Sequence, residues 1–202
     1  MKGDKRAMTD TRKYHHGNLK QALVAAGLGI LETEGLARLS LRACAEKVGV
    51  SHTAPKNHFG NVTGLLTAIA GQGFLQLNAM TRSAPGAPLA ERRRVALDGY
   101  VGFAAAHPAL FELMFSPGKV DFADPAIAEP LSTCAAVLRD VSGGAATGAG
   151  PDQRRLTEMR LWSLVHGFAT LRAQGVFDKD GMRQIGVTDL VRGILAPDPT
   201  DA

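Results

Sequence analysis

The stretch SLRACAEKVGVSHTAPKNHFGN, which begins at Ser40, constrains the fold more than any other part of the chain. Ser40 is a good N-cap for a helix over Leu41–Val48, because its side-chain oxygen can accept a hydrogen bond from an unpaired backbone N–H. Gly49 ends that helix at a position where the backbone needs a positive φ. Ser51 is expected to cap a second helix that carries Pro55 in its first turn. The sequence therefore predicts two short helices joined by a tight glycine turn.

Such a pattern is typical of a helix-turn-helix, whose second helix enters the major groove of DNA and presents its N-terminal residues to base edges. Ala45 is small at the place where the two helices would cross. An αα-hairpin in any helical bundle has a similar sequence. The local pattern alone therefore leaves DNA binding and ordinary bundle packing both open.

The remainder of the chain has apolar residues at helical spacing, with no strand-like alternation and no internal repeat. Asn18 is expected to cap the first helix, and the glycine-rich segment 143–150 is expected to form a loop. Helices are predicted over residues 18–34, 41–48, 62–80, 89–106, 108–115, 125–141, 152–174 and from 182 or 187 to 195. The sequence thus predicts an all-α fold. Its expected parts are a flexible basic arm (1–14), a three-helix helix-turn-helix domain (15–60), a larger helical domain (61–196) and a disordered tail (197–202).

Charge is distributed unevenly between the two parts of the chain. Residues 1–60 hold ten Lys and Arg against five Asp and Glu, whereas residues 61–202 hold thirteen against fourteen. The net charges of +5 and −1 suit a module that meets a polyanion, joined to one that does not. A solvated basic tail would give the same numbers, so charge alone leaves both interpretations open.

Composition argues against several classes of protein. The longest apolar runs, such as Val101–Ala106, are far shorter than the roughly 20 residues that span a bilayer. No apolar segment follows the basic N-terminus, so we expect no secretory signal and a cytoplasmic location. Cys44 and Cys134 lack partners at metal-ligand spacing, and we expect both to be reduced core residues. With no acid pair, no Ser/His/Asp grouping and no phosphate-binding glycine loop, we expect no enzyme activity, cofactor or metal.

The chain resembles the TetR family of transcriptional repressors in several motifs. The residues that match the family's N-terminal pattern are Glu34, Gly35, Ser40, Leu41, Arg42, Ala45, Gly49, Val50, Ser51, His58 and Phe59. The segments YHHGNLKQAL (Tyr14–Leu23) and APKNHF (Ala54–Phe59) look like one subgroup of that family. That subgroup carries a Trp and a His-Gly on one late helix, and WSLVHG (Trp162–Gly167) fits it.

The resemblance implies a homodimeric regulator, most readily a repressor, that binds a palindromic operator in double-stranded DNA. It also implies a C-terminal domain that forms the dimer and holds a small-molecule effector, whose binding releases the DNA. A two-fold protein reads a palindrome when its two heads match the spacing of the half-sites. We therefore expect helices 152–174 and 182–195 to pair across a two-fold axis, with Gly167 allowing a neighbouring helix to approach closely.

The residues expected to meet DNA lie in and around the second helix of the motif. Arg42 can reach a phosphate or a guanine, Thr53 a base edge or a thymine methyl, and Asn57 an adenine or a phosphate. The whole predicted set is Arg42, Ser51, His52, Thr53, Lys56, Asn57 and His58. Without the motif, each of these would be read as a polar residue on a solvated helix face.

Two positions depart from the subgroup's pattern. Lys56 stands where the subgroup usually has tyrosine, and Val62 stands where the next helix usually opens with a basic residue. The loss of one cation removes one phosphate contact, which changes the salt dependence by roughly one unit, and a lysine is a point charge rather than a flat aromatic group. An alternative function therefore stays open, namely a helical ligand-binding or interaction protein of the TetR fold with weak or lost operator binding.

The predicted ligand-binding residues are apolar or aromatic side chains of the C-terminal domain, as expected for an apolar effector. They are Tyr100, Phe103, Phe111, Met114, Phe115, Met159, Trp162 and His166. Taken singly, each fits an ordinary helical core equally well. Trp162 and His166 are spaced four residues apart on one helix face.

Overall fold

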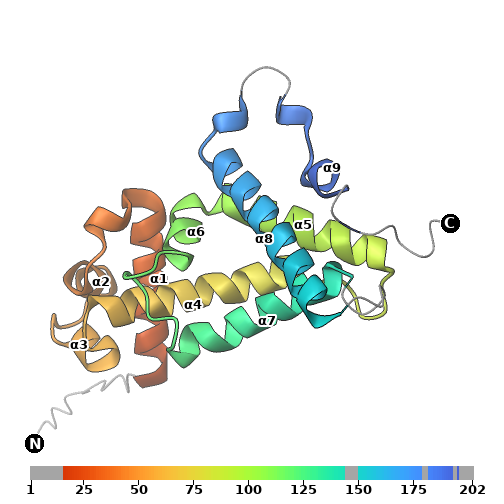
Figure 1. Cartoon of the computed structure of the whole chain (residues 1–202). Coiled ribbons are helices and arrows are strands. Elements are labelled where there is room, and N and C mark those ends of the chain that lie inside the picture. Colours follow the sequence, from red (N-terminus) through yellow and green to blue (C-terminus); the bar gives the residue numbers. More distant parts are fainter. Residues whose placement is uncertain (1–15, 144–149, 179–181, 193–194, 196–202) are drawn as a thin grey trace, which may run out of the picture.

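A computed structural model of the protein describes residues 16–143, 150–178, 182–192 and 195. The described residues form helices and turns, with a single isolated bridge between Pro117 and Val120, which confirms the predicted all-α fold (Figure 1). The elements are α1 (His16–Glu34), η1 (Leu36–Arg38), α2 (Leu41–Val48), α3 (Ala54–Phe59), α4 (Val62–Thr81), α5 (Leu89–Ala106), α6 (Pro108–Met114), α7 (Pro125–Val141), α8 (Pro151–Ala173), η2 (Val176–Asp178), η3 (Met182–Gln184) and α9 (Val187–Val191). The predicted arm 1–14, the predicted tail 197–202 and most of the glycine-rich segment lie outside the described residues.

The turn between α2 and α3 forms as its sequence predicts. The side chain of Ser40 accepts a hydrogen bond from the backbone N–H of Ala43, with an N–O distance of 3.1 Å. Gly49 has a φ of 76°, in the left-handed region that favours glycine. The N–H groups of Gly49 and Val50 both bond to the carbonyl of Ala45, at 2.9 and 3.0 Å. These bonds close the C-terminus of α2 and fix the direction in which the chain enters α3.

Two predicted caps are wrong. Helix α1 already includes His16, so Asn18 lies inside it. Thr53, rather than Ser51, is the N-cap residue of α3, and no side chain caps that helix. The carbonyl of Ser51 instead accepts a bond from the N–H of Ala54 at 3.0 Å, which builds a backbone turn ahead of the helix. Pro55 lies in the first turn, as predicted, where its missing N–H removes no helical bond.

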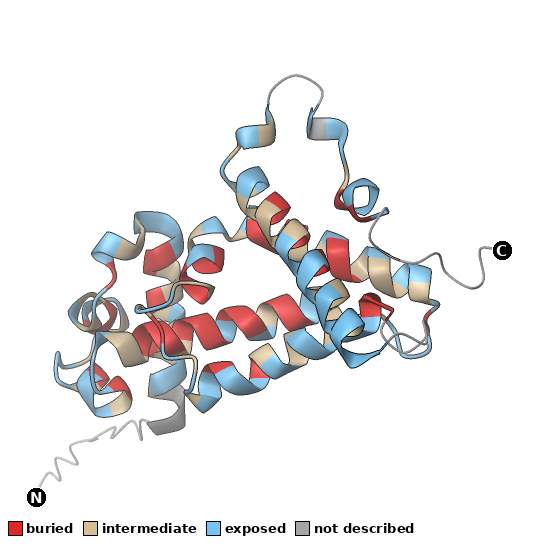
Figure 2. Ribbon diagram, in the orientation of Figure 1, coloured by how far each residue is buried: buried red, intermediate tan, exposed pale blue. Residues whose placement is uncertain are grey.

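Helix α4 is the central element of the fold, and Figure 2 shows a nearly continuous buried stripe along it. It packs against α1, α5, α6 and α7. A Cβ atom at Gly71 would overlap the carbonyl oxygen of Ala126 on α7. The side chain of Asn78, further along α4, donates to the carbonyl of Pro130 at 2.9 Å. A close backbone approach at one point and a buried hydrogen bond at another therefore fix α4 against α7.

The C-terminal helices begin and end close to the predicted positions, with one exception. Helix α8 crosses α5, and the short α9 packs against both (Figure 1). The last helix, α9, starts at Val187, one of the two predicted starts, but it ends at Val191 rather than at residue 195, and Met182 belongs to the separate turn η3. Among the described helices, none is long and apolar enough to cross a membrane.

Candidate DNA-binding surface and ligand cavity

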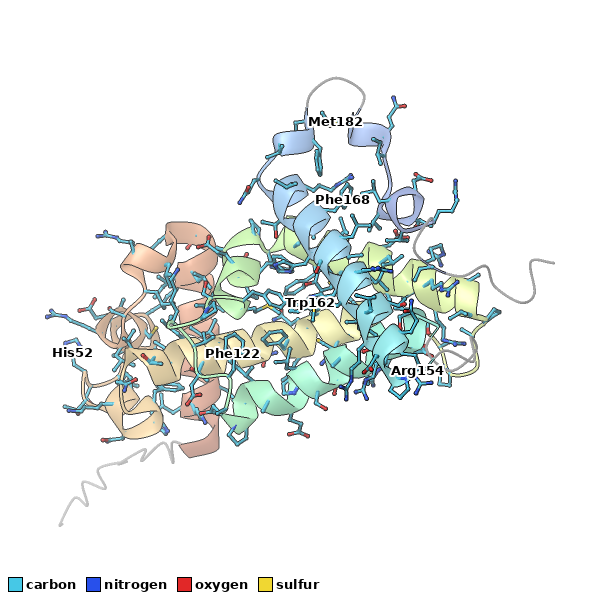
Figure 3. All side chains as sticks on the ribbon, viewed as in Figure 1. His52, Phe122, Arg154, Trp162, Phe168 and Met182 are labelled. Carbon is cyan, nitrogen blue, oxygen red and sulfur yellow. The ribbon has the colours of Figure 1, made fainter. Side chains whose placement is uncertain are left out.

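The outward face of α3 is polar because its apolar residues point inward. Pro55 and Phe59 are buried and hold this six-residue helix against its neighbours α2 and α4. The predicted DNA-binding residues in this segment are exposed, except for the half-buried His58; the exposed ones are Ser51, His52, Thr53, Lys56 and Asn57. Figure 3 places His52 at one end of the molecule and Trp162 near its centre. The structure therefore brings these residues together on an accessible surface at one end of the folded molecule.

Arg42 already has a partner on α2. Its Nε donates to the carboxylate of Glu46 at 2.9 Å, and both side chains are exposed. The hydrogen bond from Arg42 lowers the pKa of Glu46, and the nearby His52 acts in the same direction. A negative charge therefore lies beside two predicted DNA contacts. Residues of opposite charge that are four apart in a helix lie on one face, so the sequence itself predicts this ion pair.

Val62 opens α4 directly after the cap residue Asn61, whose side chain accepts from the N–H of Gly64 at 3.0 Å. Its side chain is 44% exposed, close in sequence to the polar face of α3. An apolar group at this accessible position leaves the first turn of α4 without a basic residue. The charge on this surface of the described chain therefore depends more heavily on Lys56 and Arg42.

A cavity of 290 Å³ lies between α4, α5, α7 and α8. The lining residues are uncharged and almost entirely apolar: Phe74, Leu77, Thr81, Ala96, Leu97, Tyr100, Phe115, Leu131, Cys134, Ala135, Val137, Leu138, Val141, Leu161, Trp162 and Val165. Its size and lining suit a small apolar molecule. Within the described residues, no cluster of His, Cys, Asp or Glu could hold a metal ion.

The predicted ligand-binding residues are divided between the cavity and its surroundings. Three of them, Tyr100, Phe115 and Trp162, line the cavity. The buried core side chains Phe103, Phe111 and Met114 do not line it. Met159 is 57% exposed on the outside of α8, and His166 is half-buried beside Tyr100.

Sequence reasoning missed the contribution of α7 to the cavity. Leu131, Cys134, Leu138 and Val141 all line it from this helix. They recur every three or four residues, so helical periodicity marks them as one face. Only the crossing of α7 with α4, however, shows that this face meets a cavity rather than a solid core.

An aromatic cluster closes one side of the cavity. The Tyr100 hydroxyl and Nδ1 of His166 are 2.8 Å apart, so they form a hydrogen bond between α5 and α8. The His166 ring stacks on Phe111 and meets Phe115 edge-on, with centroids 5.2 and 4.7 Å away. Burial lowers the pKa of His166 and raises that of Tyr100. Both groups are therefore uncharged at neutral pH, which matches their apolar surroundings.

The thiol of Cys134 is also part of the wall. It donates to the side-chain oxygen of Asn78 at 2.9 Å, and burial raises its pKa to about 11. A thiol with that pKa is almost fully protonated at neutral pH, which makes it a poor nucleophile. Both cysteines are free: Cys44 is buried, as predicted, and Cys134 is half-buried.

The outer face of α8 exposes apolar side chains, with Arg160 and Ser163 exposed among them. Leu156, Met159 and Leu171 are 43%, 57% and 41% exposed. Between them lies Gly167, where a Cβ atom would meet nothing within 4 Å. No helix in the described part of the chain approaches Gly167 this closely, so the expectation that it allows a close helix approach stays a prediction about a partner chain.

Two hydrogen bonds connect the N-terminal helices with the part of the chain that surrounds the cavity. Nδ1 of His107, at the joint between α5 and α6, lies 3.1 Å from the carboxylate of Glu32 on α1. The buried hydroxyl of Thr67 on α4 accepts from the N–H of Asp121 at 3.0 Å. Both bonds tie elements near the cavity to helices that support α2 and α3.

The sequence model of the tetracyclin repressor-like C-terminal domain matches residues 94–193. A solved structure of a protein of unknown function from Rhodococcus sp. RHA1 is 31% identical, covers 91% of this chain and 96% of that chain, and has a TM-score of 0.71. The chain belongs to the TetR family. The assignment to a subgroup with a Trp and a His-Gly motif stays a prediction. A comparison with curated proteins finds no match.

Other solved structures share the fold of this TetR family member at lower identity. BioQ with its natural double-stranded DNA operator is 22% identical, covers 88% of this chain and 98% of that chain, and has a TM-score of 0.59. The protein ActR from Streptomyces coelicolor, in complex with (S)-DNPA, is 22% identical, covers 79% and 72% of the two chains, and has a TM-score of 0.55. At these identities the likeness concerns the fold.

Proposed function

We propose that this TetR family protein is a ligand-responsive transcriptional regulator in the cytoplasm, most simply a repressor. It binds a palindromic DNA operator as a homodimer and is released by a small apolar effector. The observation that carries the proposal is the polar face of α3, which is held outward by the buried Pro55 and Phe59 at one end of the molecule. A short helix presented in this way fits the major groove, where its first residues reach base edges.

Similar folds in known complexes support both halves of the proposal. BioQ has been solved with its double-stranded DNA operator, and ActR has been solved with a small molecule. In the present chain, Thr53, Asn57, Lys56 and Arg42 are exposed. We propose that the first two contact bases and the last two contact phosphates. Arg42 must exchange Glu46 for DNA in order to make its contact.

The uncovered face of α8 supports the homodimer. Several large apolar side chains exposed on one face of a long helix favour an interaction surface. The open space over Gly167 leaves room for a second helix to approach closely. We propose that α8 pairs with its copy across a two-fold axis, with α9 beside it. This pairing places two α3 helices for the two half-sites of a palindrome.

Release of DNA by an effector requires that a change at the cavity reaches the DNA-binding helix α3. Helix α4 provides one connection, because it lines the cavity through Phe74 and Leu77 and packs against α3 near its start. The hydrogen bond between His107 and Glu32 provides a second connection through α1. A ligand that prefers one arrangement of these helices shifts the equilibrium toward dimers in which the distance between the two α3 helices does not match the half-sites.

A gel-shift titration with the DNA that flanks the protein's own gene, run at two salt concentrations, tests the proposal. Saturable binding that weakens as salt rises would support it, because phosphate contacts release counterions. The absence of saturable, salt-dependent binding to any palindrome in that DNA would contradict it.

The second candidate is a TetR-fold ligand-binding protein that has lost operator binding. Lys56 and the exposed Val62 favour it, because both depart from the residues expected at these positions. The double variant Lys56→Tyr with Val62→Lys discriminates between the two. A large gain in affinity from a near-zero baseline would support lost binding. A changed site preference from a strong baseline would support the regulator.

A further inference from the structure

The wall of the cavity offers no partner to a charged ligand. None of its lining residues, all within the described part of the chain, is Asp, Glu, Lys or Arg. A charge buried without a counter-ion costs several kcal/mol. A ligand that carries a carboxylate or an ammonium group inside this cavity would bear that cost in full.

Most polar groups at the wall are already bonded within the protein. The hydroxyl of Thr81 donates to the carbonyl of Leu77 in its own helix at 3.0 Å. The thiol of Cys134 donates to Asn78, whose amide donates in turn to Pro130 on α7. These bonds belong to the helices and to the contact between α4 and α7. Using them for a ligand would leave buried backbone or side-chain groups unpaired.

The hydroxyl of Tyr100 differs from these groups, because its partner is a side chain from α8. It lies 2.8 Å from Nδ1 of His166. When Nδ1 of His166 carries the proton, it donates to the Tyr100 oxygen, and the Tyr100 hydroxyl is left to donate to a ligand oxygen. Such side-chain bonds can be exchanged without opening a helix. Tyr100 and Trp162 both line the cavity, so this exchange can take place at its wall.

We propose that the cavity selects an uncharged ligand with a hydrocarbon body and one hydroxyl or carbonyl oxygen, which hydrogen-bonds to the Tyr100 hydroxyl. His166 is a positioning residue, since it holds the Tyr100 hydroxyl from α8 while Phe111 and Phe115 fix its ring. This inference rests on the proposed function only in taking the cavity as the effector site. It names the ligand class and the atom that recognises the ligand's oxygen.

Three probes with the same eight-carbon tail test the selection: 1-octanol, octanoate and octyltrimethylammonium. At pH 7.5 the first is neutral, the second is an anion and the third is a cation. Trp162 is the single tryptophan of the chain and lines the cavity, so its fluorescence reports binding directly. We expect saturable binding of 1-octanol and at least about 100-fold weaker binding of both charged probes.

Two variants test the anchor. Tyr100→Phe keeps the ring and removes the hydroxyl, and we expect it to weaken 1-octanol binding about three- to tenfold. Thr133→Val is the matched control, because it removes a hydroxyl that bonds to its own helix, α7, and does not line the cavity, so its 1-octanol affinity should match that of the unchanged protein. Far-ultraviolet circular dichroism establishes that both variants are folded before they are titrated.

Three results would overturn the inference. They are a charged probe that binds within tenfold of 1-octanol, a folded Tyr100→Phe variant with unchanged 1-octanol affinity, and an absence of saturable 1-octanol binding. Operator binding is measured on the same preparation. If DNA binding persists while the probes fail, only the ligand class is wrong. If DNA binding is absent, it is the proposed function that fails.

Discussion

The exposed face of α3 and the exposed face of α8 differ in what they offer to solvent. On α3 the accessible side chains are polar, with Lys56 and Asn57 at its centre and both apolar anchors buried. On α8 the accessible side chains include Leu156 and Met159, and further along the helix a Cβ atom at Gly167 would meet open space. The polar side chains of α3 are well hydrated, so their exposure to water is favourable. The apolar side chains of α8 are not, so association that buries them lowers the free energy.

This difference teaches how one chain separates two kinds of recognition. A polyanion is best met by hydrated, charged and hydrogen-bonding groups on a helix that stays exposed until DNA arrives. A second copy of the chain is best met by an apolar stripe with a small residue where backbones approach. Helix α4 lies between the two surfaces and borders the cavity, so it is the element through which they can influence one another.

The largest expected effect comes from placing a charge on the apolar face. Gly167→Arg puts a guanidinium where the partner's helix is proposed to pack, and an unpaired buried charge costs several kcal/mol. We expect at least about a 100-fold weaker dimer, measured by sedimentation velocity at micromolar concentration. Gln72→Arg, on the exposed side of α4, is the matched control and should leave the dimer intact. If the unchanged protein is a monomer at that concentration, the claim that the exposed face of α8 forms a dimer is wrong.

On the polar face, Lys56→Ala should weaken operator binding about three- to tenfold at low salt and reduce the salt slope by about one unit, because one phosphate contact is lost. Fluorescence anisotropy with labelled DNA at several salt concentrations measures both quantities. Lys119→Ala removes a cation that lies far along the chain and pairs with Glu112, so it serves as the control. If the salt dependence of operator binding is the same for Lys56→Ala and for the unchanged protein, Lys56 does not contact a phosphate.

A smaller effect is expected when Arg42 is released from its partner. Glu46→Gln removes the carboxylate that holds Arg42 at 2.9 Å and that also lies near His52. Ion pairs between exposed side chains are weak, so we expect operator affinity to rise only about two- to threefold. The same anisotropy titration measures it. Tighter binding would place Arg42 at the DNA, whereas weaker binding would mean that Glu46 itself contacts a base.

The smallest effect concerns the inner side of α8. Burial lowers the folded-state pKa of His166 below its unfolded value, so the unfolded chain takes up the proton first as pH falls. The neutral ring contributes its full stability above the unfolded pKa, near 6.5, and this stability is lost as pH falls from there through the lower folded-state pKa. Thermal melting between about pH 7.5 and 5.5 should therefore show a smaller acid-induced decrease for His166→Gln than for the unchanged protein. Identical decreases would mean that His166 is not the group responsible.

The sequence predicted the helix-turn-helix closely because its signals are local. A cap at Ser40 and a positive φ at Gly49 depend on neighbouring residues alone, and both form as expected. Ser51 failed as a cap because a backbone turn to Ala54 competes with its side chain. Such competition depends on the path of the chain and is hard to read from residue types.

The ligand site was harder to predict because a cavity is a property of helix crossings. Met114 and Phe103 look like lining residues in the sequence, but the packing of the helices buries them in the core. Leu131 and Cys134 reach the cavity because α7 lies close against α4, where Gly71 removes a side chain and Asn78 bonds to Pro130. No periodicity rule specifies that approach between two helices separated by more than forty residues.

Sedimentation of labelled operator DNA, with the protein added in increasing amounts, tests the central claim most directly. The DNA is the palindrome selected in the gel-shift titration, and the mass of the complex reports how many chains each site holds. The account predicts saturable binding of one homodimer per palindrome, reversed by higher salt, because paired α8 helices place two α3 helices on one site. A complex that holds a single chain, or no saturable complex, would contradict it.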